Sequence, residues 1–418
     1  MKKSSILAVV AGNMIEWYDF ALYLFLAPVL AHNFFAEENH LNAMLSTFLI
    51  FAIGFFIRPL GSILFGHLGD RIGRTKTLKI SILLISLSTI LMGLLPTYQH
   101  FGIYAGLMLA FLRLIQGLCI GGEFAGSMIY LSEMAAADNR GFMSSMANNG
   151  SNFGVLCATL IAALIASVMS EPEFYDYGWR ISFVFGGILG LVGLWFRRNL
   201  VETPVFDALS SNKKILKLPI LTVFKYHKKD MLNISLLLVM SATGSYVLLE
   251  FMSTYLNQYF DYPLSKALQV QSIYNVLTFL FIAIAAKFSD RYGRRPLLML
   301  SAIGYIICTI PCFYFLETTG LWICLLPLVI FYCIEQATTP VTMVEIFSPK
   351  ARYTGISFSY NTTMALIGGT APMINTWLIA KFDNPMIIAY YLVIAALISL
   401  LVIYKRLPQK FGRELDLI

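Results

Sequence analysis

Long apolar runs separated by short polar segments fill almost the whole of this 418-residue chain. A helix needs about 20 residues to cross the roughly 30 Å of hydrocarbon in a bilayer. Divided at its polar breaks, the pattern predicts an all-α polytopic membrane protein with twelve transmembrane helices. The predicted spans are 6–31, 43–66, 77–96, 103–131, 143–169, 179–198, 231–257, 267–288, 296–316, 320–344, 355–380 and 386–404.

The longest polar stretch lies in the middle of the chain and divides the spans into two sets of six. We expect an N-terminal six-helix bundle over 1–198, a cytoplasmic linker over 199–230 and a C-terminal six-helix bundle over 231–418. The predicted fold is therefore two six-helix halves joined by one basic linker.

Composition and charge agree with this picture. Hydrophobic residues make up 58% of the chain and charged residues 13%, against about 25% charged residues in a typical soluble domain. The twelve-span topology places all but five of the 30 Lys and Arg residues on one side of the membrane, the exceptions being Arg58, Arg113, Arg180, Lys266 and Lys381. Because Lys- and Arg-rich loops stay in the cytoplasm, we expect a multi-pass protein of the cell inner membrane with both termini cytoplasmic. The net charge of +7 then reflects topology, and we expect no nucleic-acid partner.

Motifs for catalysis or metal binding are missing from the sequence. The six cysteines fall inside apolar runs without a C-x-x-C pair, and the five histidines show no metal-ligand spacing. We find no nucleotide-binding loop and no nucleophile motif. We therefore predict no catalytic residue, no metal site and no enzyme activity. A receptor is also disfavoured, because we see no added cytoplasmic signalling domain.

A loop pattern occurs twice, after the second and after the eighth predicted span. Residues 66–78 read GHLGDRIGRTKTL and residues 286–298 read AKFSDRYGRRPLL, so D-R-x-G-R recurs in register. At the ends of the fourth and tenth spans, a glutamate also precedes an arginine by seven positions. The repeated positions are Asp70, Arg71, Gly73, Arg74, Glu133 and Arg140 in the first half, and Asp290, Arg291, Gly293, Arg294, Glu345 and Arg352 in the second. The repeat indicates duplicated halves related by a pseudo-two-fold axis along the membrane normal.

The first loop, G-x-L-x-D-R-x-G-R, resembles the signature loop of the major facilitator superfamily. More narrowly, the chain resembles the metabolite:proton symporter family through GNMIEWYDF (12–20), IRPLG (57–61), RLIQGLCIGGEFAGS (113–127), ARYTGISFSYN (351–361) and GGTAPMINTWL (368–378). The resemblance implies the fold of that superfamily and uptake of small organic acids or zwitterions such as proline and betaine. It also implies that the repeated loop residues form a cytoplasmic gate network, which holds the halves together when the inside is closed.

Charged residues within the spans are the candidate transport site, because each costs at least about 2.5–3.5 kcal/mol to insert. Glu16 and Asp19 are three residues apart, so one helix face presents both, with Asn13 and Tyr23 nearby. Two such close carboxyl groups do not readily ionise together, and proton coupling needs a carboxyl that gains and loses a proton. We predict Glu16, Asp19 and Glu123 as proton-coupling residues.

The predicted substrate site centres on the fourth span, where Arg113, Gln116 and Glu123 occupy one sector of the helix. The planar guanidinium of Arg113 can bind a substrate carboxylate, or it can form a structural pair with Glu123 or Glu16. One member of the Glu16 and Asp19 pair can likewise serve only to pair with Arg58 or Arg113. The predicted substrate-binding residues are Asn13, Tyr23, Arg58, Arg113, Gln116, Tyr246, Glu250 and Glu335, and the candidate aromatic walls are Trp17, Tyr18, Tyr255 and Trp377.

These features favour a proton-coupled symporter that imports a small carboxylate-bearing metabolite by alternating access. The predominance of acidic over basic side chains in the spans suits a zwitterion such as proline or betaine, with a dicarboxylate such as 2-oxoglutarate as the alternative. An exporter of drugs or metabolites is less favoured, because residues 150–156 lack the proline of the drug-antiporter motif. We expect a monomer in the lipid bilayer that binds a small molecule, with protons as the coupling ion and no cofactor.

Overall fold

The computed structural model describes residues 3–36, 40–62, 64, 74–121, 123–133, 135–197, 225–316, 324–347 and 352–407. Almost all of these residues are helical, and none of them lies in a strand. Eight of the helices are long and apolar enough to cross a membrane, or nine if one bent pair is counted as a span. Helical segments occupy the described part of every one of the twelve predicted ranges, which confirms the all-α polytopic fold class.

The first half contains α1 (Lys3–Phe25), α2 (Ala27–Phe34), α3 (His40–Phe56), α5 (Arg74–Leu94), α6 (Tyr98–Phe101), α7 (Ile103–Ile120), α8 (Glu123–Glu133), η1 (Ala137–Asn139), α9 (Arg140–Val168), α10 (Glu171–Glu173), η2 (Phe174–Gly178) and α11 (Trp179–Arg197). The first predicted span is not one straight helix, because its two parts, Val10–Phe25 and Ala27–Phe34, meet at 64°. Pro28 stands in the first turn of α2, where its missing N–H costs no intrahelical hydrogen bond.

The second half contains α14 (Lys228–Gly244), η3 (Ser245–Phe251), α15 (Met252–Tyr259), α16 (Leu264–Tyr292), α17 (Arg294–Tyr314), α20 (Leu326–Ile346), α21 (Arg352–Thr363), η4 (Met364–Gly368), α22 (Ala371–Phe382) and α23 (Ile387–Arg406). Two of these spans change to π-helix in the middle, at η3 and η4. Such wider turns often mark functional sites in helices.

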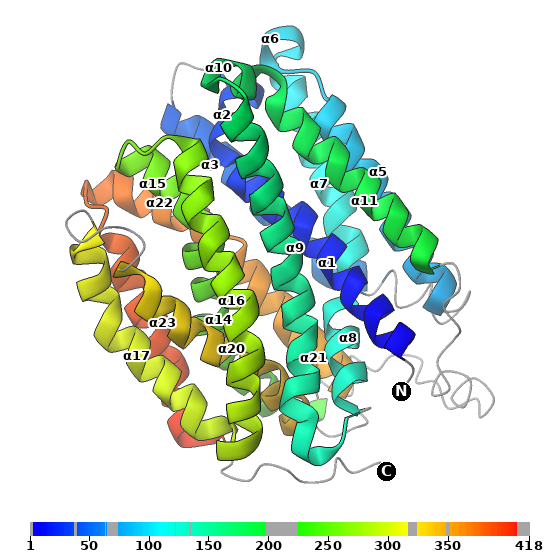
Figure 1. Ribbon diagram of the computed structural model, residues 1–418, viewed down its shortest axis with the longest axis vertical. Helices are drawn as coiled ribbons and strands as arrows, with labels where there is room; N and C mark the ends of the chain where they lie inside the picture. Colours follow the sequence, from blue (N-terminus) through cyan, green and yellow to red (C-terminus); the bar gives the residue numbers. More distant parts are fainter. Residues whose placement is uncertain are drawn as a thin grey trace.

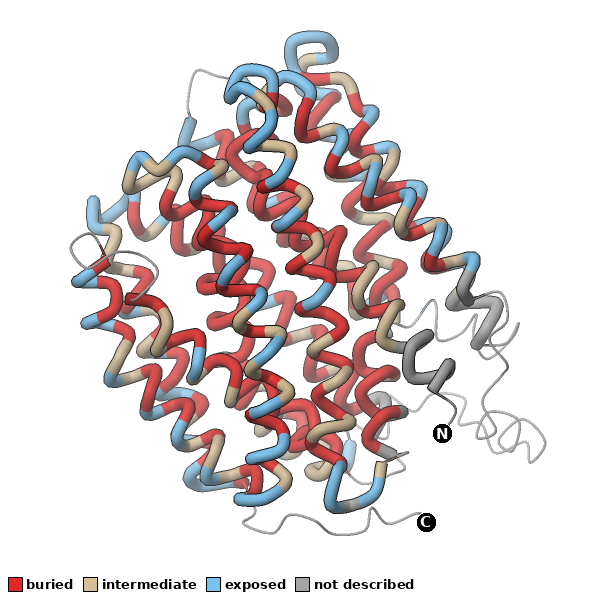
Figure 2. The backbone as a smooth tube through the Cα atoms, in the orientation of Figure 1, coloured by how far each residue is buried: buried red, intermediate tan, exposed pale blue. Residues whose placement is uncertain are grey.

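The outer helices carry exposed apolar side chains at helical spacing. On α17 these are Leu300, Ile303, Ile307, Ile310 and Tyr314, and on α11 they are Ile181, Phe185, Ile188, Val192 and Trp195. Figure 2 shows exposed positions along these peripheral helices, whereas the helices in the middle of the bundle are mostly buried. Apolar faces of this extent match a lipid environment, since soluble monomers rarely expose large apolar patches.

The helices of the two halves meet along a central seam, where α9 lies beside α16 (Figure 1). Further contacts across the seam join α9 to α20, α3 to α22 and α8 to α21. The helices α9 and α16 correspond to the fifth and eighth predicted spans, and α3 and α22 correspond to the second and eleventh. A two-fold axis that exchanges the halves converts one contact into the other, as the repeated loops predict. The predicted linker, 199–230, lies mostly outside the described residues.

Candidate transport site

A buried polar network surrounds Arg113 inside the first half. One guanidinium nitrogen, Nη1, lies 3.7 Å from Asp19 Oδ2 and donates to Gln116 Oε1 at 2.8 Å. Gln116 Nε2 donates to Thr89 Oγ1 at 3.0 Å, and the Thr89 hydroxyl donates to Asp19 Oδ1. The network therefore joins the first, third and fourth spans. The structure brings together three residues that the sequence proposed and adds Thr89 from α5, which the sequence analysis missed.

Aromatic rings enclose the two arginines within the spans. The Arg113 guanidinium carbon lies 4.2 Å from the ring centre of Phe20 and 4.4 Å from that of Tyr23. Arg58 lies 4.2 Å from the same Phe20 ring and 3.7 Å from Phe55. Ring faces attract a cation and replace part of its lost hydration. Arg113 thus has a carboxylate partner in Asp19, whereas Arg58 contacts ring faces and no carboxylate among the described residues.

The remaining predicted residues of the first half lie around this network. Glu16 is buried on the same helix as Asp19. Asn13 instead faces α8 and α9, where it donates to Ala147 O at 3.3 Å and accepts from Ser127 Oγ at 3.2 Å. The side chain of Glu123 lies outside the described part of the chain.

A small cavity of about 30 Å³ lies between the halves. The first half contributes Trp17, Phe124, Asn148, Ser151, Asn152 and Val155, and the second contributes Leu238, Ser241, Ser245, Leu249, Glu250, Tyr332, Gln336, Thr339, Pro340, Met343, Tyr360 and Met364. This volume holds about one water molecule, so a metabolite requires the lining helices to separate. Of the predicted substrate-binding residues, only Glu250 lines the cavity.

A hydrogen-bonded link crosses the cavity from α9 to α20. Asn148 Nδ2 donates to Gln336 O at 2.7 Å and to Gln336 Oε1 at 2.9 Å. Gln336 Nε2 in turn donates to Ser241 Oγ at 3.0 Å and Ser245 Oγ at 3.1 Å. The Gln336 carbonyl is free to accept across the seam because Pro340, four residues later in α20, has no N–H to donate. The sequence analysis missed this link, although Pro340 inside an apolar span was a usable signal.

The π-helix η3 places Tyr246 and Glu250 in the core of the bundle. Tyr246 is buried against Phe51 and Phe55 of the first half, with ring centres 5.9 and 5.4 Å apart. Glu250 faces the cavity. Glu335 is buried in α20, where Thr339 donates to it, and it lies outside the cavity lining.

The predicted aromatic walls have different surroundings. Trp17 lines the cavity, whereas the hydroxyls of Tyr18 and Tyr255 donate to Ser182 O and Pro385 O at 3.0 and 3.2 Å. Trp377 is 47% exposed on the outer surface, which suits a membrane anchor.

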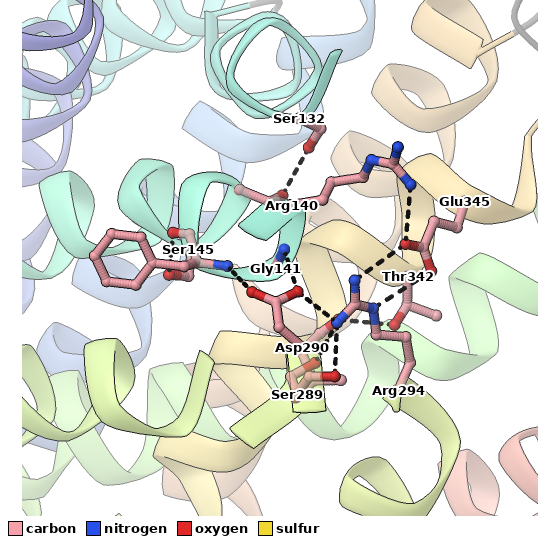
Figure 3. Close-up of polar contacts among 12 residues, drawn as sticks. Ser132, Arg140, Gly141, Ser145, Ser289, Asp290, Arg294, Thr342 and Glu345 are labelled. Carbon is pink, nitrogen blue, oxygen red and sulfur yellow. Dashed lines mark hydrogen bonds and ion pairs between the residues drawn. The ribbon is translucent and has the colours of Figure 1, made fainter. Parts of the chain in front are cut away.

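Four residues of the predicted gate network meet at one end of the seam (Figure 3). Asp290 accepts hydrogen bonds from Gly141 N at 2.8 Å and Phe142 N at 2.9 Å, so it caps α9 of the other half. Arg294 lies 2.9 Å from Asp290 Oδ1 and 3.2 Å from Glu345 Oε1, and Arg140 Nη1 is 3.6 Å from the same Glu345 oxygen. The helix cap and the ion pair between Arg140 and Glu345 both join the two halves.

The other members of the predicted gate are not part of this cluster as far as the structure describes them. Gly293 separates α16 from α17 at φ +95°, a conformation that favours glycine. Arg291 is exposed and lies 5.6 Å from the ring of Tyr292. Asp70, Arg71 and Gly73 lie outside the described residues, as do the side chains of Arg74, Glu133 and Arg352.

Metal binding finds no support in this part of the chain. No group of three or more His, Cys, Asp or Glu side chains among the described residues could hold a metal ion.

Known proteins resemble this chain over nearly its whole length. The Major Facilitator Superfamily profile matches residues 9–372 and 270–414. The proline/betaine transporter of Escherichia coli (strain K12) is 32% identical over 415 residues, covering 96% of this chain and 82% of the relative. A glycine betaine/proline/ectoine/pipecolic acid transporter of Dickeya dadantii (strain 3937) matches with the same identity and coverage.

Solved structures share the fold at lower identity. The xylose transporter XylE from E. coli, in a partially occluded inward open conformation, aligns with a TM-score of 0.77 and 20% identity over 97% of this chain and 98% of that chain. A crystal structure of a D-xylose-proton symporter gives the same TM-score at 22% identity, with 98% and 99% of the two chains covered. The buried charges, the seam between two halves, the family profile and these relatives together show that the chain belongs to the major facilitator superfamily of membrane transporters.

Proposed function

We propose that this transporter is a proton-coupled symporter that imports a small zwitterion, such as proline or betaine, by alternating access. The observation that carries the proposal is the buried network of Asp19, Arg113, Gln116 and Thr89. A carboxylate at this depth is costly unless it is paired or protonated. Proton binding to Asp19 would release its contact with Arg113, so the protonation state and the packing of three spans are linked. Glu16 and Glu123 are the further candidates for carrying the proton.

The gate cluster supports alternating access. The cap that Asp290 forms on α9 exists only while the ends of the two halves are together. A contact that is present in one conformation and absent in another biases the equilibrium between them. On the proposed topology this end of the bundle faces the cytoplasm, with both termini on the same side of the inner membrane, and the six-helix bundles over 1–198 and 231–418 move relative to each other as a monomer.

The names of the relatives support a zwitterionic substrate. The cavity lining supports it too, because it contains one carboxylate, Glu250, and neither Lys nor Arg. A dicarboxylate such as 2-oxoglutarate carries two negative charges that this lining does not neutralise, so it remains the less favoured substrate class.

Uptake by purified protein in sealed vesicles tests the proposal. We expect labelled proline or betaine to accumulate when an inward proton gradient is imposed, and accumulation to collapse when a protonophore is added. A panel containing 2-oxoglutarate, citrate and shikimate identifies the substrate class in the same assay. Uptake that depends on sodium and ignores the proton gradient would contradict the proposal.

A further inference from the structure

The cavity between the halves has an unusual chemical composition for a site that accepts a carboxylate-bearing metabolite. Its lining holds Trp17, Phe124, Tyr332 and Tyr360 as well as Glu250. Both predicted cationic ligands, Arg58 and Arg113, are absent from it, and Arg113 already has Asp19 and Gln116 as partners. The electrostatic character of the cavity is therefore set by one acid and several aromatic faces.

Glu250 is buried, with 2% of its surface exposed. Its carboxylate has neither a hydrogen-bond donor nor an ion-pair partner within the described chain, and its Oε2 atom is enclosed without a donor. Arg58 and Arg113 influence it electrostatically, but neither forms an ion pair with it. The π-helical turn of η3 carries this side chain into the cavity. A buried acid without a partner, aimed into a cavity, is suited to a cationic ligand.

Aromatic rings from both halves stand around the same space. Phe124 of α8 stacks on Tyr360 of α21 with ring centres 4.8 Å apart, and Trp17 of α1 meets Phe124 edge to face at 6.4 Å. Faces of Trp, Tyr and Phe near a carboxylate form the kind of site that binds alkylated ammonium groups, which offer charge but few or no N–H donors.

We propose that Glu250 and the aromatic group of Trp17, Phe124 and Tyr360 form the subsite for the alkylated ammonium end of the substrate. The inference rests on the proposed function and adds to it the location of the positive end. The amides of Asn148, Asn152 and Gln336 line the same cavity. Their N–H groups donate to partners within the protein in this structure, so binding the carboxylate end requires them to exchange these partners. Because Trp17 and Phe124 belong to one half and Glu250 and Tyr360 to the other, a cation bound here contacts both halves and favours their closure.

A pair of isosteric ligands measures this subsite directly. Glycine betaine and 3,3-dimethylbutanoate have nearly the same shape and the same carboxylate, but only betaine carries a positive charge. Isothermal titration of the full-length protein in nanodiscs yields the ratio of the two dissociation constants. For the unaltered protein we expect betaine to bind about 30-fold or more tightly, the equivalent of about 2 kcal/mol from desolvated cation–π contacts.

Two variants remove the proposed contacts one at a time. Glu250→Gln is expected to reduce the ratio by about tenfold or more, because the charged acceptor is lost while the shape is kept. Tyr360→Leu is expected to reduce it about fivefold, and Tyr360→Phe, which keeps the ring, is expected to change it less than about twofold. If Glu250→Gln does not fold, the comparison of Tyr360→Leu with Tyr360→Phe tests the proposed subsite in its place. Glu335→Gln tests the competing assignment of the positive end to another buried acid. Asp383→Asn, at an exposed position beyond α22, is the control and should leave the ratio of dissociation constants as it is.

The outcomes separate this inference from the proposed function. If betaine binds and is taken up but Glu250→Gln leaves the ratio unchanged, the subsite is wrong and the proposed function stands. A ratio that falls in Glu335→Gln instead would place the positive end at Glu335 and overturn the inference. If the unaltered protein neither binds nor transports betaine or proline, both proposals fail together.

Discussion

Replacing Asp290 by Asn should loosen the gate end of the seam. The carboxylate accepts two backbone N–H groups of α9 at 2.8 and 2.9 Å and pairs with Arg294 at 2.9 Å. Asn offers one carbonyl oxygen and no charge, so at most one bond to α9 survives, as a neutral one. Charge-assisted hydrogen bonds contribute about 1.5–3 kcal/mol and neutral ones about 1 kcal/mol. The net loss is therefore about 2–5 kcal/mol, which favours opening of this end by about 30- to 4,000-fold.

Hydrogen–deuterium exchange of the protein in nanodiscs measures this change. Amide protection should fall in the first turn of α9, residues 140–144. It should also fall at the end of α20, residues 342–346, which contacts Asp290 only through Arg294 in the observed cluster. Loss at both places indicates separation of the halves rather than loss of one cap.

A matched substitution controls for the removal of a carboxylate. Asp383 is exposed beyond α22, at φ +46°, a left-handed conformation that Asn also tolerates. Asp383→Asn should leave protection at α9 and α20 unchanged. If Asp290→Asn folds and shows no faster exchange than Asp383→Asn, the cap does not stabilise the closed gate and the reasoning is refuted.

Three further predictions concern the core. Arg113→Lys keeps the charge but removes the planar guanidinium, whose carbon lies over the rings of Phe20 and Tyr23 while its Nη1 contacts Asp19 and Gln116, so initial uptake rates should fall by about tenfold or more. Unchanged kinetics would make Arg113 peripheral to transport. At least one of Glu16→Gln and Asp19→Asn should retain counterflow exchange while losing proton-driven accumulation, because an amide resembles the protonated acid and cannot release a proton. Loss of exchange and accumulation together in both variants would indicate a structural role for the two acids. Gly117→Ala should lower thermal stability by about 1–3 kcal/mol, because the added methyl collides with the backbone carbonyl of Gly54 in the neighbouring helix α3. Gly106→Ala in the same helix should cost less, because its methyl meets the movable ring of Phe35 at 3.3 Å and the Phe34 carbonyl at an ordinary contact distance of 3.5 Å.

Much of the candidate site followed from helix geometry alone. Arg113 and Gln116 are three residues apart, so any helix through this region places them on one face, and the structure joins them by a hydrogen bond. The repeated D-R-x-G-R loop likewise located Asp290 and Arg294 before any contact was known. Local spacing determines such pairs because neighbouring turns of one helix fix their relative positions.

Partners on other helices could not be read from spacing. Thr89 on α5 completes the network of Asp19 and Arg113, and Asn148 on α9 reaches Gln336 on α20. These contacts depend on which helices are neighbours and how each is rotated about its axis. The sequence of a span that is apolar on its lipid-facing side and of mixed polarity on the other gives only weak information about how the helix is rotated about its axis.

The sequence by itself therefore determined the helical class, the membrane setting, the duplicated halves and the set of charged residues that must face inward. The duplicated halves follow from the repeated loops. The other properties follow from the cost of exposing backbone polar groups and charges to hydrocarbon, which acts on every segment separately. Only the tertiary structure decided that Arg113 is paired with Asp19 and that Glu250 stands without a partner in the cavity. That decision arises from helix packing and from the π-helical turn at η3, which redirects one side chain without a clear signal in the local apolar pattern.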